Sequence, residues 1–401
     1  MIKKLLFTLF GLGFAGMVWS QTDSWRIEIS LNDRLQLPFF LEETTQGTKF
    51  EESTYVVLNG KERINLNFNA SDGDSIELSF KEMDSYLKFA YTDSINIRGY
   101  WRNIRKGITY PLTGSKGNYN RFSPTSNAET KKVFNSYGVV FGDEKDVWPA
   151  VGLFEQEGGH LTGTFLTETG DYRYLEGNVF GNQLYLSCFD GAHAFVFTAK
   201  ISRDSLSGYF YSGGSYKTNW VGVKNEKASI GSPDSLTYLV SDEYDLTDIR
   251  LRSLRGFKKK LKFSKSPLTI IQIMGSWCPN CLDETNYFKE VYRKYKEHGL
   301  NIIALGFESQ KTSKKRRKHL KAFTEKARIP YPVYLAGSAS KKEASKKFSM
   351  LSSISSFPTT LFVNQKGKIV HVHTGFYGPG TGVYFDRYQI GIEQRIEKYI
   401  K

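Results

Sequence analysis

Cysteine is scarce in this chain, with three residues among 401. That is too few for a fold that disulfides scaffold, even in an oxidising compartment. Beyond the first twenty residues, no segment is apolar enough for a bilayer span, which needs roughly 20 apolar residues. Hydrophobic residues make up 40% and charged residues 24%, as is ordinary for a folded protein. The composition therefore excludes a disulfide scaffold, a membrane bundle and a disordered chain.

The first twenty residues, "MIKKLLFTLFGLGFAGMVWS", have the layout of a secretory signal peptide. Lys3 and Lys4 form a basic start, and residues 5–18 form an apolar run that is too short for a membrane anchor. No cysteine follows this run, so a lipoprotein anchor is not expected. We predict a cleaved signal over residues 1–20 and a soluble protein in the periplasm or cell envelope.

The remaining length suggests two or three domains, and the net charge is +14. For an exported basic protein, an anionic membrane surface or an acidic partner is a more natural counterpart than nucleic acid. No nucleic-acid partner is expected. Peripheral contact with a membrane surface and formation of a homodimer remain open.

Short alternating segments fill the first half of the chain. From residue 24 to about 220, β-branched and aromatic residues recur at every second position, with turn sequences such as "SDGD" and "NG" between them. This pattern predicts an antiparallel β domain over residues 21–235, in the form of a sandwich or a barrel. The polar stretch 115–135 is expected to be a long loop or a short helix.

From about residue 236 the pattern changes to alternating strands and helices. The run "LTIIQIM" (268–274) is typical of a strand buried on both faces. A helical pattern follows the cysteines and stops at Gly299, and the basic stretch 311–329 predicts a second helix. Residues 359–376 predict a hairpin, and the end of the chain an amphipathic helix. We therefore expect residues 236–401 to hold a linker and a three-layer α/β domain.

Two of the three cysteines, Cys278 and Cys281, stand between the buried strand and its helix in "GSWCPNC". Pro279 suits the first position of the helix. The Cys278 sulfur should then face free backbone N–H groups and the positive end of the helix dipole, which favour a thiolate. A more buried Cys281 could resolve a mixed disulfide, so the pair fits thiol–disulfide exchange.

Two structural alternatives to a redox pair are a zinc site and a purely structural disulfide. Zinc would need two more soft ligands, but Cys188 lies in the β half, and His371 and His373, two apart on one face of a strand, lack zinc-finger spacing. A disulfide across two residues closes a tiny loop and stabilises little. We therefore expect redox chemistry with no metal and no cofactor.

The sequence "WCPNC" (277–281) after a buried strand, together with Phe357-Pro358-Thr359-Thr360, resembles the thioredoxin fold. More narrowly, it is similar to the exported TlpA/ResA-type thiol–disulfide oxidoreductases, over about residues 240–401. The resemblance implies a cis Pro358 against the disulfide, with the edge at Phe357 free to pair with an extended peptide. It implies a substrate groove formed by Trp277, Pro279, Asn280, Phe357, Pro358 and Thr359.

Glu284 extends the motif to C-x-x-C-x-x-E, where the family places an acidic residue. Such a carboxylate can accept or pass the proton of the buried thiol, or it can simply stabilise the helix N-terminus. Gln272 occupies the strand position where cytosolic thioredoxins carry an ionisable aspartate, so Glu284 is the better proton acceptor here. Gly275 stands where the peroxiredoxin relatives need a threonine, which argues against peroxide as the substrate.

The resemblance implies a reductase of protein disulfides that takes electrons from a membrane thiol transporter. Antioxidant defence and cytochrome c maturation are roles that it suggests. Two alternatives remain open: a disulfide oxidase or isomerase, and a cell-envelope binding or assembly β module with a redox-regulated appendage. The role of the β half is not assigned.

Three further features have plainer explanations than function. Cys188, at the end of an alternating strand, is expected to be a small core residue. The basic run 311–321 is expected to be the solvated face of a helix that buries Leu320 and Phe323. Asp190-Gly191, just before His193, is first of all a turn sequence.

Overall fold

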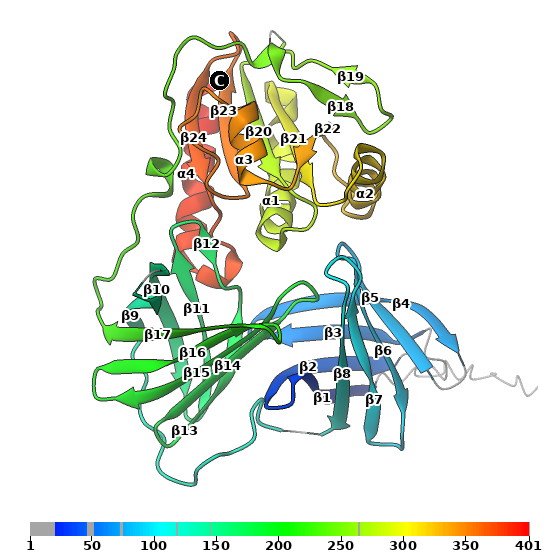
Figure 1. Ribbon diagram of the computed structural model, residues 1–401, viewed down its shortest axis with the longest axis vertical. Helices are drawn as coiled ribbons and strands as arrows, with labels where there is room; N and C mark the ends of the chain where they lie inside the picture. The colour runs from blue at the N-terminus through cyan, green and yellow to red at the C-terminus, as the bar shows by residue number, and fades with distance from the viewer. Residues whose placement is uncertain are drawn as a thin grey trace, which may run out of the picture.

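The computed structural model describes residues 21–45, 52–72, 75–117, 119–144, 146–263 and 265–400. Residues 1–20, where a signal peptide is predicted, lie outside the described residues. Two β-rich units lie side by side below a third unit that contains the helices (Figure 1). The predicted combination of antiparallel barrel-like β structure with a C-terminal α/β domain is confirmed.

The first barrel is a closed antiparallel ring in which each strand pairs with the next and β1 also pairs with β8. Alternate side chains such as Trp25, Ile27 and Ile29 point into its core, as the period-two pattern requires. Its strands are β1 (Gln21–Asn32), β2 (Leu35–Thr45), β3 (Thr54–Asn59), β4 (Glu62–Asp72), β5 (Ser75–Phe80), β6 (Ser85–Tyr91), β7 (Asn96–Asn103) and β8 (Ile108–Lys116).

The second barrel follows a polar loop that includes residues 119–135. Its strand order is β10-β9-β17-β16-β15-β14-β13-β11-β12, and a further β10–β11 pairing closes the ring. Packed aromatic rings fill it, among them Phe141, Phe165 and Phe197. Its strands are β9 (Ser136–Asp143), β10 (Asp146–Glu157), β11 (His160–Thr167), β12 (Gly170–Asp171), β13 (Leu175–Phe180), β14 (Gln183–Phe189), β15 (Ala194–Ser202), β16 (Ser205–Ser212) and β17 (Tyr216–Lys224).

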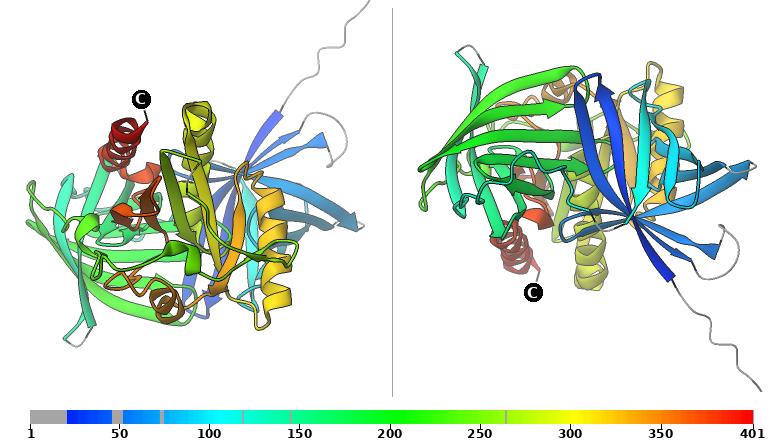
Figure 2. Two further views of the ribbon diagram at one scale, coloured as in Figure 1. Left: turned by 90° about the horizontal axis from the view of Figure 1, so that it is seen from above. Right: turned by 90° about the horizontal axis from the view of Figure 1, so that it is seen from below.

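The two barrels lie side by side (Figure 2), and buried residues of the second barrel pack into the core of the first. Phe189 at the end of β14 packs on Phe39 of the first barrel, with ring centroids 4.5 Å apart. The fully buried Arg121, in the loop between the barrels, pairs with Glu176 at 2.7 Å. The β half is thus two barrels where one β domain was expected, because the same alternation runs through both and does not reveal where a ring closes.

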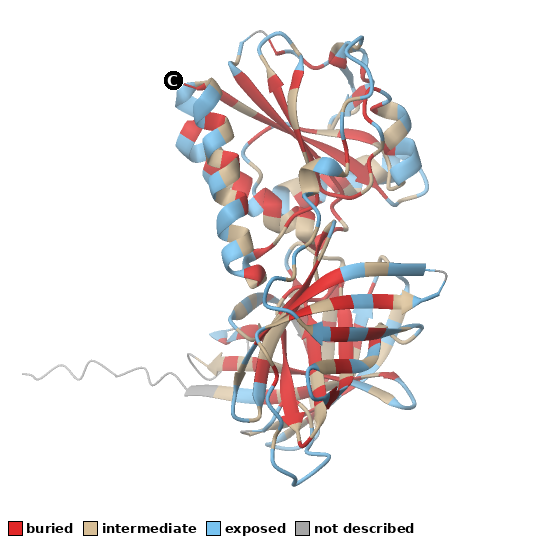
Figure 3. Ribbon diagram, turned by 90° about the vertical axis from the view of Figure 1, so that its left-hand side faces the viewer, coloured by how far each residue is buried: buried red, intermediate tan, exposed pale blue. Residues whose placement is uncertain are grey.

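The C-terminal domain has a mixed sheet of order β19-β18-β22-β21-β20-β23-β24, whose central strands are buried on both faces (Figure 3). Strands β20, β21 and β22 are parallel, while β23 and β24 form the predicted antiparallel hairpin. Its strands are β18 (Leu251–Ser253), β19 (Lys258–Lys259), β20 (Leu268–Met274), β21 (Leu300–Glu308), β22 (Val333–Ser338), β23 (Thr359–Asn364) and β24 (Ile369–Thr374).

In the described part of the chain, four α-helices accompany this sheet: α1 (Pro279–Tyr295), α2 (Ser313–Lys326), α3 (Lys341–Lys347) and α4 (Val383–Tyr399). Helices α1 and α4 lie side by side, since the Tyr287 hydroxyl donates to the Gln389 carbonyl at 3.2 Å. Helix α3, which the sequence analysis did not anticipate, is only seven residues long. Among the described residues, no helix has the length and apolar character of a membrane span.

Candidate functional site

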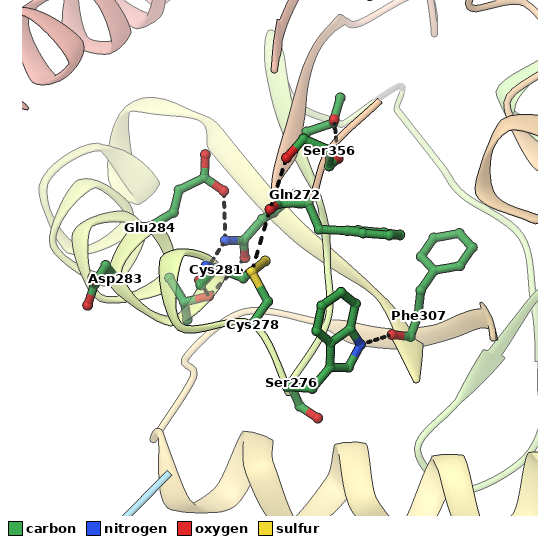
Figure 4. Close-up of a disulfide and its surroundings, with 12 residues drawn as sticks. Gln272, Ser276, Cys278, Cys281, Asp283, Glu284, Phe307 and Ser356 are labelled. Carbon is green, nitrogen blue, oxygen red and sulfur yellow. Dashed lines mark hydrogen bonds between the residues drawn. A yellow bond between two sulfur atoms is a disulfide. The ribbon is translucent and has the colours of Figure 1, made fainter. Parts of the chain in front are cut away.

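A disulfide joins Cys278 and Cys281 where β20 gives way to α1 (Figure 4). Cys278 caps the helix, and Pro279 occupies its first position. The Cys281 N–H donates to the Cys278 sulfur at 3.2 Å. Cys278 is 7% exposed and Cys281 is 0% exposed. In the reduced state, the same N–H and the positive helix end would favour a thiolate on Cys278, with Cys281 behind it.

Two aromatic rings flank the disulfide. The Trp277 indole N–H donates to the Phe307 carbonyl at 2.8 Å, and its ring meets that of Phe357 edge to face at 5.6 Å. The Phe357–Pro358 peptide bond is cis. The Cys278 sulfur lies 3.5 Å from the Phe357 carbonyl oxygen. The CxxC segment and the proline loop, far apart in the sequence, are therefore in contact at the sulfur that would react.

Thr359 and Asn280 occupy different environments. Thr359 is fully buried, and its hydroxyl donates to the Ser356 carbonyl at 2.8 Å, so it shapes the proline loop from behind. Asn280 faces the second barrel at Gly170, where an added Cβ would lie 2.6 Å from the Asn280 amide nitrogen. The structure thus brings Asn280 to the open side of the disulfide and leaves Thr359 on the inner side.

Glu284 is fully buried one turn after Cys281. Its carboxylate accepts hydrogen bonds from Gln272 at 2.8 Å, Thr360 at 2.9 Å and Tyr388 at 2.8 Å. The same Gln272 amide donates to the Cys281 carbonyl at 3.2 Å, which ties the carboxylate to the buried cysteine (Figure 4). Burial raises the pKa of Glu284 to about 7, and the three donors limit that rise. A carboxyl group with this pKa can exchange a proton near neutral pH.

A second, partly buried network fixes the turn before Cys278. Ser276 donates to Glu308 through its N–H at 3.0 Å and its hydroxyl at 2.6 Å. His319 of α2 bonds Glu308 at 3.2 Å on one side and, on the other, Asp84 in the β5–β6 turn of the first barrel. These hydrogen bonds from His319 to Asp84 and Glu308 raise the pKa of His319 to about 9. At neutral pH a charged histidine therefore links the first barrel to the cysteine turn.

Arg173 joins all three parts of the molecule. Its guanidinium reaches Glu62 of the first barrel at 2.7 Å, Asp190 of the second barrel at 3.2 Å, and Asp283 in the first turn of α1. Arg173 is 8% exposed and has a positive φ of 66°. Burial opposes ionisation of Asp190, yet His193 and Arg173 hold its pKa below the usual range. One buried cation therefore holds both barrels against the helix that carries the cysteines.

The second barrel also meets the Gly-rich loop that follows β24. The Gly378 N–H donates to Asp171 at 2.6 Å, and a Cβ at Gly375 would lie 2.5 Å from the Thr169 carbonyl oxygen. Residues 373–382 thus form part of the seam with the β11–β12 turn.

These contacts leave a cleft of about 670 Å³ between the three parts, with the disulfide on one wall. The C-terminal domain contributes Trp277, Cys278, Pro279, Asn280, Ser356 and Phe357. The first barrel contributes Arg105 and Lys106. The second barrel contributes Trp148, Pro149, Thr167, Glu168, Thr169, Gly170, Asp171, Tyr172, Ala192, His193 and Phe195. Most of the wall that faces the disulfide thus comes from the β half.

Sequence reasoning missed Arg105, Arg173 and His319. Arg105 stands in an ordinary polar turn and Arg173 in a short segment between strands, so no motif marks them. His319 belongs to the basic face of α2, whose buried side is Leu320 and Phe323 as predicted. The roles of these residues depend on how the barrels dock on the C-terminal domain. Local sequence patterns do not predict such docking. The Asp190–His193 turn, considered but set aside, does reach the cleft.

Two other predicted features lie away from the disulfide. Cys188 is fully buried in the core of the second barrel, as expected of a small core residue. His371 and His373 of β24 meet Asp234 of the interdomain connector, with their ligand atoms within 4.8 Å of one another. Arg395 also donates to Asp234 at 2.8 Å, so this cluster is an ion-pair clasp between the connector and the C-terminal domain.

Comparison with known proteins places the C-terminal domain. Residues 253–381 match the Redoxin family model. The chain is 25% identical over 128 residues to thioredoxin-like protein YneN of Bacillus subtilis, covering 32% of this chain and 68% of that protein. It is 29% identical over 117 residues to thiol-disulfide oxidoreductase ResA of Bacillus cereus, covering 29% of this chain and 60% of that protein. The match thus spans less than two thirds of ResA.

A solved thioredoxin domain of a thiol-disulfide oxidoreductase from Bacteroides vulgatus aligns with 37% of this chain and 98% of its own length, at 17% identity and a TM-score of 0.28. The strand order and the family match together define residues 253–381 as a Redoxin domain with a thioredoxin-like fold. That domain is similar to the ResA and YneN proteins, and two β barrels precede it.

Proposed function

We propose that this protein is an exported thiol–disulfide oxidoreductase that reduces protein disulfides in the cell envelope. The observation that carries the proposal is the Cys278–Cys281 pair at a helix N-terminus, with the Cys278 sulfur against the cis-proline loop and open to a cleft. The Redoxin match and the names of the ResA relatives support the same chemistry.

In the proposed reaction, the Cys278 thiolate attacks one sulfur of a substrate disulfide. The substrate S–S bond breaks, a mixed disulfide forms, and the first substrate thiolate leaves and takes up a proton. Cys281 then loses its proton to Glu284, attacks the Cys278 sulfur and releases the second substrate thiol. The substrate gains two electrons and two protons, and the protein is left with the Cys278–Cys281 disulfide.

Each further turnover needs an external dithiol as electron donor, and we propose a membrane thiol transporter for this role. Trp277 and Phe357 would shield the sulfurs, Pro279 and Pro358 would shape the two loops, and Asn280 would contact substrate at the rim. Antioxidant defence and cytochrome c maturation are processes that such a reductase could serve. Export rests on the predicted signal over residues 1–20.

Insulin-disulfide reduction with dithiothreitol as donor tests the proposal. Cys278→Ser should abolish the rate above background, and Cys281→Ser should accumulate a mixed disulfide through Cys278 that a mass shift reveals. Cys188→Ser, which alters the thiol away from the cleft, is the matched control and should keep the wild-type rate. Full activity in Cys278→Ser would reject the assignment, and it would favour a binding role for the β half.

A further inference from the structure

The cleft over the disulfide has an uneven distribution of charge. Arg105 and Lys106, in the β7–β8 turn of the first barrel, line it on one side. Glu168 lines it from the second barrel and is exposed to solvent. The carboxylates of Asp171 and Asp190, deeper in the wall, are already engaged with Gly378 and Arg173 respectively. The lining charges that no ion pair neutralises are therefore those of the solvated Glu168 and of Arg105 and Lys106, so the cations are in the majority.

Arg105 lies close to the reacting sulfur. Its guanidinium sits over the Trp277 ring, 6.0 Å from the centroid, one residue before Cys278. Within the described ranges Arg105 forms no direct ion pair, although Asp84 and Glu308, which both bond His319, attract its charge from farther away. Burial lowers the pKa of Arg105, and the two carboxylates limit that fall. The cation therefore lies in a partly dry site with no direct ion-pair partner.

Lys106 stands beside it with its ammonium on the Ala192 carbonyl at 2.7 Å, across the seam between the barrels. A backbone carbonyl satisfies one of its three donors, and no carboxylate is paired with it in the part of the chain that the structure describes. The buried arginines of the described ranges differ from the half-buried Arg105: Arg121 pairs with Glu176, and Arg173 pairs with three carboxylates. Arg105 is thus unlike both of these arginines, because it lacks a direct ion pair.

We propose that the cleft selects disulfides that carry a carboxylate next to the reacting sulfur, and that Arg105, assisted by Lys106, binds that carboxylate. The inference rests on the proposed function and adds its substrate class. A guanidinium and a carboxylate match in geometry, and their attraction is strongest where water is partly excluded. A volume of about 670 Å³ lies within the usual range for small ligands, so the disulfide arrives on a short flexible segment or a small molecule.

The electron balance is that of the proposed reaction, with the substrate reduced to two thiols and Cys278–Cys281 oxidised. The carboxylate is not consumed. It would hold the substrate sulfur beside Cys278 and so raise the rate of the first attack. Because the attraction is electrostatic, added salt should weaken it.

A single-turnover experiment tests this without the physiological donor. The full chain is reduced, freed of reductant and mixed with peptide disulfides that differ only in having Glu, Gln or Lys next to cysteine. We expect the Glu peptide to react about tenfold faster than the Lys peptide at low salt. Arg105→Gln should remove most of that ratio, and Arg105→Lys should restore part of it. Arg102→Gln, which removes an exposed charge from the same barrel, is the matched control and should keep the wild-type ratio.

The outcomes separate the two levels of the proposal. If no disulfide is reduced, the proposed function itself fails. If all three peptides are reduced at equal rates, or if Arg105→Gln keeps the wild-type ratio, only the charge-selective site is rejected. Glutathione disulfide, a small molecule with carboxylates, gives a further comparison: a rate above that of the Glu peptide indicates a small-molecule substrate, and a lower rate indicates a peptide segment.

Discussion

The C-terminal domain and the β barrels contribute to the same cleft in different ways. The domain supplies the sulfurs, and their setting is local: a strand end, a helix start and the cis-proline loop fix it. The barrels supply most of the surrounding wall and its charges, and these depend on contacts between distant parts such as Arg173 with Asp283. The difference suggests that the C-terminal domain alone determines how reactive the cysteines are. The barrels docked against it determine which molecules reach the cysteines.

The largest expected effect comes from removing Arg173, the cation that pairs with all three parts of the molecule. Arg173→Leu leaves Glu62, Asp190 and Asp283 without their shared cation. Removing one partner of a buried ion pair costs about 3–5 kcal/mol, so we expect a clear drop in the free energy of unfolding, measured by urea denaturation. Arg173→Lys should lower the free energy of unfolding by a smaller amount. If Arg173→Leu unfolds at the wild-type urea concentration, Arg173 does not hold the three parts together.

Glu284→Gln tests whether residues of the C-terminal domain control the reactivity of the cysteines. Since the pKa of Glu284 is about 7, wild-type kcat/KM should rise as the pH passes through 7, when the carboxylate becomes available as a base. The variant should lose this rise with pH, and its kcat/KM should be roughly 10²-fold lower than that of the wild type above pH 7, a typical effect for a general base. An unchanged pH profile would mean that Glu284 serves only to pack the helix.

The charge of Glu284 also affects the stability of the folded protein. Its folded pKa is raised above the usual value of 4.5, so its contribution to stability is full below pH 4.5 and declines as the pH rises toward 7. A shift of this size corresponds to about 3 kcal/mol. Urea unfolding of wild type relative to Glu284→Gln, measured at pH 4.5 and pH 8, should show this decline. A difference between the two proteins that does not vary with pH would contradict it.

His319→Gln should have a smaller effect, confined to the link between the first barrel and the cysteine turn. The raised pKa of His319, about 9, means that its ion pairs are fully present below pH 6.5 and are lost as the pH rises through 9. Because the site is partly exposed, we expect a loss of about 1 kcal/mol at pH 7 and none at pH 10. Equal losses at both pH values would point to packing instead of charge.

Cys188→Ala should have the smallest effect. The side chain fills the core of the second barrel, so we expect a loss of about 1 kcal/mol in thermal unfolding and no change in disulfide reduction. A loss of reduction at unchanged stability would give Cys188 a chemical role that its burial argues against.

The two regions also differ in how far the sequence foretold them. Strand β20, the Cys278 cap, Pro279 and the hairpin of β23 and β24 follow from local patterns, so the thioredoxin-like fold and the place of the CxxC were predictable. Glu284 was marked only by its spacing, and its bonds to Thr360 and Tyr388 appear only when the strands and α4 come together.

The barrels were predictable as antiparallel β structure and no further. Alternation shows which face of a strand is buried, but it does not reveal that β1 pairs with β8 or that β10 pairs with β11. The approach of Arg105 to Trp277 depends on how the first barrel docks on the C-terminal domain. Charged residues in turns are usually solvated, so nothing local separated this arginine from its neighbours.

The most direct test of the central claim is the reduction potential of the Cys278–Cys281 pair, measured in the full chain against glutathione or dithiothreitol buffers. A reductase should be near the thioredoxin value of about −270 mV, so that electrons flow from the protein to its substrates. A value near −120 mV, typical of a strong periplasmic oxidant, would contradict the reductive assignment.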